Sequence, residues 1–157
     1  MKILKITLIA FIATVIFNNT IAAQYVRTVN YSTSTSSNGS ALMLSVIKTK
    51  MAMEGYNLAS DDYFTISEND IKIKNRSFHP NNNYVIIVLP TEDGVNDLDL
   101  YMCDSFGNTI LKDADNNASA MISYSPYSQC NAVLKIKNQD SNRLGYAYDA
   151  HLLIFYK

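Results

Sequence analysis

The feature that most constrains the fold is the alternation of apolar and polar residues between positions 97 and 103. One side of this extended segment carries Leu98, Leu100 and Met102, and the other carries Asp97, Asp99, Tyr101 and Cys103. A period of two is typical of a β-strand that buries one face. Gly107 follows at a turn, where it can adopt the positive φ of a short hairpin. The segment therefore predicts one strand of an antiparallel sheet and the hairpin that ends it.

Seven other segments have a similar length and are separated by Asn, Gly, Asp and Pro residues. We expect strands at 63–67, 71–78, 83–89, 108–112, 119–124, 132–138 and 146–156. Short strands at this spacing predict an antiparallel β-sandwich of the jelly-roll kind. The last segment is apolar on both faces, which is typical of a strand in the middle of a sheet.

The start of the chain has the three parts of a secretory signal peptide. Lys2 and Lys5 precede a short apolar stretch, and small residues near Ala22 and Ala23 offer a cleavage site. The apolar stretch is short for a membrane span, so an uncleaved anchor is the weaker alternative. We expect residues 1–23 to be removed and the protein to be secreted or periplasmic, with no membrane span afterwards. About 134 residues would remain, which is the usual size of one domain.

Residues 24–40 are polar and of low complexity, and they predict a flexible lead-in. From 41 to 58 the chain is rich in helix-forming residues and predicts one amphipathic helix within a single domain at 41–157. Its apolar stripe includes Leu44, Ile47 and Met51. We expect this stripe to pack on the sandwich. The alternative is a methionine-rich arm that binds a partner.

Charge and cysteine content narrow the functional classes. The chain has 13 basic and 14 acidic residues, and this balance gives no basic patch for nucleic acid. The two cysteines, Cys103 and Cys130, predict a disulfide, because an even number of cysteines in an exported protein usually pairs. A reactive thiol would need an activating neighbour that the nearby sequence does not supply.

The order of motifs from 77 to 157 resembles the bacterial pre-peptidase C-terminal domain, a small jelly-roll sandwich of secreted proteins. The matching motifs are the Asp-x-Asp-Leu-Tyr-x-x-Asp pattern at 97–104, Gly107, the Asp-rich loop at 113–117 and the strand that ends before Pro126. A Gly-x-Tyr motif of that family is replaced here by residues 129–132, and no peptidase domain precedes the match. The resemblance implies a non-catalytic binding or accessory module.

Acidic residues in this region are the best candidates for a metal site. Asp97 and Asp99 share a strand face, and loops could bring Asp93, Asp113 and Asp115 near them. Ca²⁺ prefers such clusters of oxygen ligands, and some relatives of this sandwich bind it, so Asp97 and Asp99 are the candidate Ca²⁺ ligands. The competing interpretation is that Asp and Asn are ordinary turn residues here.

Tyrosines near the end of the chain suggest a binding surface. The candidates are Tyr124, Tyr127, Tyr146 and Tyr148, although tyrosine is also common in ordinary strands. We therefore predict an exported, non-catalytic module that recognises a protein or a carbohydrate. The alternatives are a small secreted hydrolase that uses loop carboxylates, and a secreted inhibitor or structural protein. No aromatic sugar platform or tryptophan accompanies the carboxylates, which disfavours a glycosidase.

Overall fold

The computed structural model describes residues 37–157, and side chains are described from residue 42 onwards. One helix, α1 (Ser37–Met53), precedes eight strands. The strands are β1 (Asn57–Ser67), β2 (Ile71–Phe78), β3 (Tyr84–Pro90), β4 (Val95–Cys103), β5 (Thr109–Asp113), β6 (Ala120–Tyr124), β7 (Cys130–Ser141) and β8 (Ala147–Tyr156). The expected signal peptide and most of the expected lead-in lie outside the described residues.

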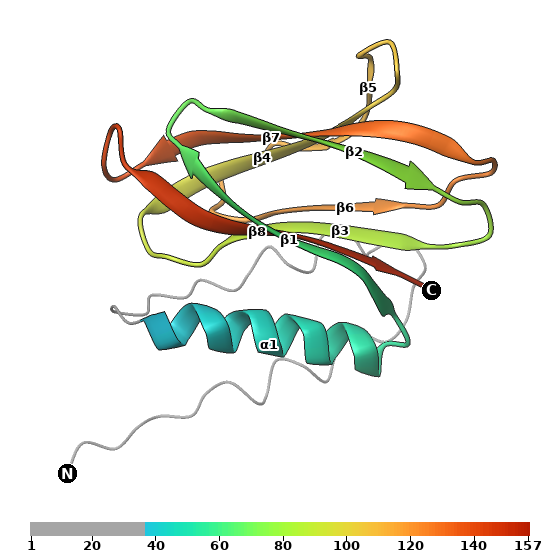
Figure 1. Ribbon diagram of the computed structural model, residues 1–157, viewed down its shortest axis with the longest axis horizontal. Coiled ribbons are helices and arrows are strands. Elements are labelled where there is room, and N and C mark those ends of the chain that lie inside the picture. The colour runs from blue at the N-terminus through green and yellow to red at the C-terminus, as the bar shows by residue number, and fades with distance from the viewer. Residues whose placement is uncertain (1–36) are drawn as a thin grey trace.

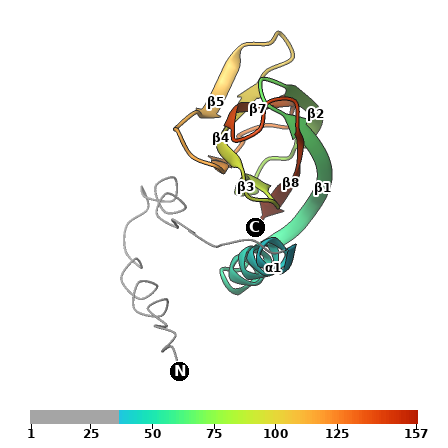
Figure 2. The same cartoon turned by 90° about the vertical axis from the view of Figure 1, so that its left-hand side faces the viewer.

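The strands form two antiparallel sheets of four, which confirms the predicted β-sandwich. Sheet A has the order β1-β8-β3-β6, and sheet B has the order β2-β7-β4-β5. The end view in Figure 2 shows the two layers, with β1, β8 and β3 on one side and β2, β7, β4 and β5 on the other. The first strand pairs with the last, the second with the seventh, the third with the sixth and the fourth with the fifth.

The main core lies between the sheets and follows the predicted alternation. In β4, Leu98, Leu100 and Met102 are fully buried, and their neighbours on the same inner face of sheet B include Leu134 and Ile136 of β7. Burying a large aliphatic side chain contributes about 1.5–3 kcal/mol, so these rows dominate the stability of the sandwich.

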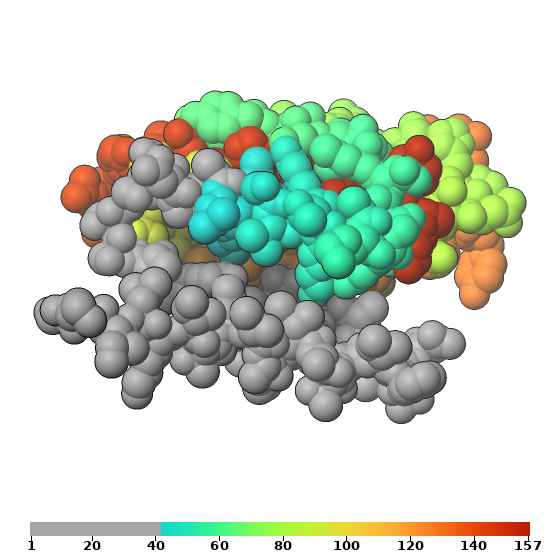
Figure 3. All heavy atoms as spheres, turned by 90° about the horizontal axis from the view of Figure 1, so that it is seen from below, coloured from blue at the N-terminus to red at the C-terminus, as the bar shows by residue number. Residues whose placement is uncertain are grey.

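The helix covers the outer face of sheet A. Figure 1 shows α1 running beneath the sheet that contains β1, β8 and β3, and Figure 3 shows it lying across that face. Met51 is buried there, and Leu44 and Ile47 pack against the same apolar cluster, which β3 and β8 supply. The packed position of the helix is therefore confirmed. Strands β3 and β8 are buried on both faces, as the apolar sequence of the last strand predicted.

The helix ends five residues earlier than expected, and β1 begins within the predicted helical range. Gly55 has a φ of +83°, which favours glycine because a Cβ strains this conformation. Gly55 N donates to Ala52 O at 3.0 Å and Tyr56 N donates to Met51 O at 2.9 Å. These two bonds are the Schellman motif, which closes the helix and turns the chain into the sheet. Among the described residues, no helix is long and apolar enough to cross a membrane.

The predicted disulfide is wrong, since both Cys103 and Cys130 are free thiols. Cys103 is the register partner of Val133, three residues away from Cys130 along β7. Cys103 alternates with the core residue Met102, so its side chain is on the outer face of sheet B, whereas Cys130 packs against the inner core. The two side chains lie on opposite faces of the sheet and are three residues out of register, so their Cβ atoms cannot reach the short separation that a disulfide requires.

Candidate functional site

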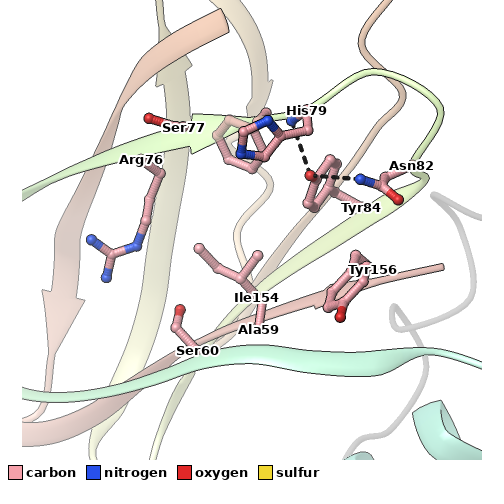
Figure 4. A pocket seen from close by; sticks show the side chains of 10 residues that line it. Ala59, Ser60, Arg76, Ser77, His79, Asn82, Tyr84, Ile154 and Tyr156 are labelled. Carbon is pink, nitrogen blue, oxygen red and sulfur yellow. Dashed lines mark hydrogen bonds between the residues drawn. The ribbon is translucent and has the colours of Figure 1, made fainter. Parts of the chain in front are cut away.

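A pocket opens on the side of the sandwich where the edges of the two sheets meet. It encloses about 270 Å³, and its walls come from β1, β2, β3, β8 and the loop that joins β2 to β3. Figure 4 shows residues of β2 and β1 on opposite sides, with Ile154, Tyr84 and Tyr156 between them. The lining residues are Ala59, Ser60, Arg76, Ser77, Phe78, His79, Asn82, Tyr84, Ile154 and Tyr156. We call this the edge pocket.

Aromatic rings give the edge pocket a rigid apolar wall. The ring centroids of Phe78 and Tyr84 lie 4.9 Å apart at an angle of 85°, and the Tyr84 and Tyr156 centroids lie 6.4 Å apart. Phe78 also meets Tyr124 edge to face behind the pocket. Edge-to-face pairs stabilise each other by about 0.5–1.5 kcal/mol beyond area burial, which helps to hold the rings of Phe78, Tyr84 and Tyr124 in place.

Polar groups at the edge pocket include hydroxyls with unused hydrogen-bonding capacity. Tyr84 Oη accepts hydrogen bonds from His79 N at 3.0 Å and Asn82 Nδ2 at 3.2 Å, as the dashed lines in Figure 4 mark. Its own proton therefore remains to be donated. Ser60 Oγ is buried and has no described hydrogen-bond partner. Arg76 is held in place by an ion pair with Asp62 and by donation to Asn75 O.

The two candidate Ca²⁺ ligands lie far less open to solvent than the alternation predicted. Asp99 is only 3% exposed and accepts hydrogen bonds from Tyr101 Oη at 3.0 Å and Gln139 Nε2 at 2.6 Å. The loop between β5 and β6 lies beside this strand, since Leu98 N donates to Asn117 O at 2.8 Å and the backbone of Asn117 hydrogen-bonds to Asp97. Burial and then repulsion by Asp99 raise the pKa of Asp97.

The other acidic residues of the predicted cluster have local structural partners. Asp113 Oδ2 accepts from Met121 N at 2.9 Å, and the backbone oxygen of Asp115 accepts from Asn117 N at 2.7 Å. Across residues 37–157, no three His, Cys, Asp or Glu side chains are grouped so that they could hold a metal ion.

The four candidate tyrosines do not share one surface. Tyr124 and Tyr127 lie where β6 leads into β7, whereas Tyr146 and Tyr148 lie after β7 has run the length of the sheet. Tyr127 is fully exposed and Tyr148 is buried. Tyr124 Oη lies 3.1 Å from Cys130 Sγ, and this hydrogen bond, with burial second, raises the pKa of Tyr124 to about 12.

A second polar cluster joins the helix to sheet A. Asp61 of β1 lies 2.5 Å from His151 Nδ1 of β8 and 2.6 Å from Lys48 Nζ of α1. Burial acts to raise the pKa of Asp61, but the hydrogen bonds from His151 and Lys48 outweigh it and lower that pKa. An Asp–His pair also occurs in hydrolases, where the imidazole activates a hydroxyl or thiol. Here the His151 ring packs edge to face on Tyr63, and among the described residues it hydrogen-bonds to Asp61 and to no hydroxyl or thiol.

Neither a protein-family model nor a curated protein matches this chain.

The edge pocket escaped the sequence-based prediction for a simple reason. Its residues come from segments as distant as Ser60 and Tyr156, and they meet only because β1 pairs with β8. The one available signal was the cluster of His, Pro and Asn at 79–83, a loop between two strands. Loops of that kind often carry binding residues, but sequence alone does not show what they face.

Proposed function

We propose that this protein is an exported, non-catalytic binding module that takes one unit of a carbohydrate ligand into the edge pocket. The observation that carries the proposal is the combination of fixed aromatic rings with the unused hydroxyl groups of Tyr84 and Ser60. Ligand sites usually combine apolar walls with a few placed polar groups. The sequence left a protein ligand open as well, and the unused hydroxyls favour a sugar. The signal-like residues 1–23 support action outside the cytoplasm.

The chemistry of the lining residues supports binding rather than catalysis. None of the ten lining residues is Asp, Glu or Cys. The nearby carboxylate of Asp62 is already paired with Arg76. A retaining glycosidase needs two carboxyl groups about 5 Å apart across its cleft, and the edge pocket does not provide them.

The strand order supports a jelly roll as the finer description of the sandwich. Nested pairing of first with last, second with seventh, third with sixth and fourth with fifth is what a long hairpin gives when it is wound into two sheets. Kinship with the pre-peptidase C-terminal domain remains part of the proposal, and its support is the set of motifs between 97 and 126.

Nitrogen-15 labelled full-length protein can test the pocket with a panel of neutral sugars, namely glucose, galactose, mannose and N-acetylglucosamine. We expect at least one of them to shift the amide signals of Asn82 and Tyr84 in a saturable way. Tyr156→Ala should weaken that binding, because it removes one aromatic wall. Tyr127→Ala removes a fully exposed tyrosine that does not line the pocket and serves as the matched control. Absence of pocket shifts with every sugar would contradict the carbohydrate assignment.

A further inference from the structure

The outer face of sheet B has no helix over it within the described residues. Figure 2 shows α1 on the side of sheet A, with β5, β4 and β7 on the far side. Ile71 and Ile73 of the edge strand β2 are 55% and 59% exposed on this face. We call it the bare face.

A row of three side chains crosses the bare face in register. Tyr101 of β4 pairs with Lys135 of β7 on one side and with Lys112 of β5 on the other. Adjacent strands lie about 4.8 Å apart, so the two lysines flank the tyrosine with their Cα atoms about 10 Å from each other. Neither lysine has an ion-pair partner among the described residues. We call these three residues the Lys–Tyr–Lys row.

The side chain of Tyr101 runs along β4 toward Asp99. Its hydroxyl donates to Asp99 Oδ2 at 3.0 Å, and Asp99 is the preceding residue on the same face. Two such residues are about 6.7 Å apart, which is close to the reach of a tyrosine side chain. The phenol ring therefore lies over the strand between Tyr101 and Asp99, and Tyr101 remains partly exposed to solvent. Gln139 Nε2 holds Asp99 in place at 2.6 Å, so the ring has a fixed anchor.

We propose that the Lys–Tyr–Lys row binds an anionic saccharide. One sugar ring would stack on the outward side of Tyr101, and its carboxylate or sulfate would lie near Lys112 or Lys135. Stacking uses a flat aromatic ring, and the lysines supply the opposite charge. An acidic peptide would need only the lysines. This site is separate from the edge pocket and does not depend on the function proposed for it.

The charges around the row favour the side away from Asp99. Asp97 and Asp99 lie along β4 toward its start, and Lys137 is the register partner of Asp99. In the other direction the next row is Val133, Cys103 and Thr109, which carries no formal charge. The anionic group of the stacked sugar would therefore point sideways from Tyr101 toward Lys112 or Lys135, and away from Asp97 and Asp99.

Titration calorimetry of the full chain can test this with four probes. These are trigalacturonate, its neutral methyl ester, a sulfated galactose trisaccharide and a short poly-glutamate. We expect trigalacturonate or the sulfated sugar to bind, with affinity that falls as salt rises, and the methyl ester and poly-glutamate to bind much more weakly. The first two probes tell whether carboxylate or sulfate is the preferred group.

Substitutions can test whether the saccharide binds at the Lys–Tyr–Lys row. The double variant Lys112→Gln and Lys135→Gln should lower the affinity about tenfold, as the loss of two exposed ion pairs implies. Tyr101→Ala should lower it for the acid and the methyl ester alike. Lys50→Gln on α1 removes one positive charge from the opposite side of the molecule and should leave binding unchanged.

Several results would overturn the proposal. They are equal binding of the acid and its methyl ester, equal or tighter binding of poly-glutamate, no binding of either anionic sugar, and full affinity in the double lysine variant. Tyr156→Ala in the edge pocket should have no effect here, so failure of one site is distinguishable from failure of the other.

Discussion

At the scale of single residues, the predictions that failed were those that depended on which face of the sheet a side chain lies on and on what covers it there. Alternation along β4 correctly grouped Asp99, Tyr101 and Cys103 on one face. It did not show that Gln139 of β7 would cover Asp99, because that contact depends on the register between two strands. Nor did it fix the inward direction of Cys130, the first residue of β7. The period of two predicts which residues of one strand share a face, but it does not predict which residues of neighbouring strands are in contact.

Asn138 gives a first test at this scale. It lies in β7 opposite the core residue Leu98 and is 0% exposed. Neither its Nδ2 nor its Oδ1 has a described hydrogen-bond partner. A buried polar group without partners costs about 1–3 kcal/mol. We expect Asn138→Leu, which has a similar volume, to raise the free energy of unfolding by about 1–2 kcal/mol. Urea unfolding monitored by tyrosine fluorescence measures it.

Asn116→Leu, in an exposed loop, is the control for Asn138 and should change stability by less than about 0.5 kcal/mol. A clear loss of stability in Asn138→Leu would show instead that the amide holds a buried water.

Asp97 gives a second test, through pH. Its pKa is raised, first by burial and then by repulsion from Asp99, so the folded state binds the proton more tightly than the unfolded chain does. Ionisation of Asp97 therefore lowers stability as pH rises from the ordinary carboxyl pKa through the raised one. We expect Asp97→Asn to have a higher melting temperature than the parent at pH 7 and a similar one at pH 3. Lower stability of Asp97→Asn at pH 7 would contradict this sign.

At the scale of elements, the strands were predictable and the ends of the helix were not. All eight predicted strands exist within a few residues, apart from β1, which begins six residues earlier than predicted and takes its first two residues from the expected helix. Residues 54–58 have no strong pattern of their own, and the end of α1 depends on the positive φ of Gly55. Strand periodicity extends over many residues, whereas this boundary rests on one glycine.

The packing of α1 can be measured by comparing two side chains of the helix. Met51 is 7% exposed in the cluster on sheet A, and Val46 is 50% exposed on the other side. We expect Met51→Ala to lower the free energy of unfolding by about 2–4 kcal/mol, through lost burial and a residual cavity. Val46→Ala should cost less than about 0.5 kcal/mol. Similar small losses in both variants in a denaturant titration would mean that the apolar stripe does not hold the helix.

At the scale of the whole molecule, the order of the strands in the two sheets places the residues of both candidate binding sites next to one another. The edge pocket needs β1 beside β8 and the edge of β2 across from it. The Lys–Tyr–Lys row needs β4 between β7 and β5. Sequence patterns predicted the sandwich but not this order, because pairing among eight similar strands depends on long-range contacts. The sequence therefore predicted a binding module but could not predict where a ligand would bind.

The same strand order makes a prediction about cooperativity. Strands β3 and β8 contribute to both apolar clusters, since Ile86 and Leu152 face the main core while Ile87 and Leu153 face the helix. Loss of either cluster would expose one face of both central strands, so we expect helix and sheets to unfold in one transition. Hydrogen exchange with mass spectrometry, at low denaturant, should give similar opening free energies for the amides of α1 around Met51 and of β3. Exchange of the α1 amides at an opening free energy several kcal/mol below that of β3 would show that the helix detaches independently.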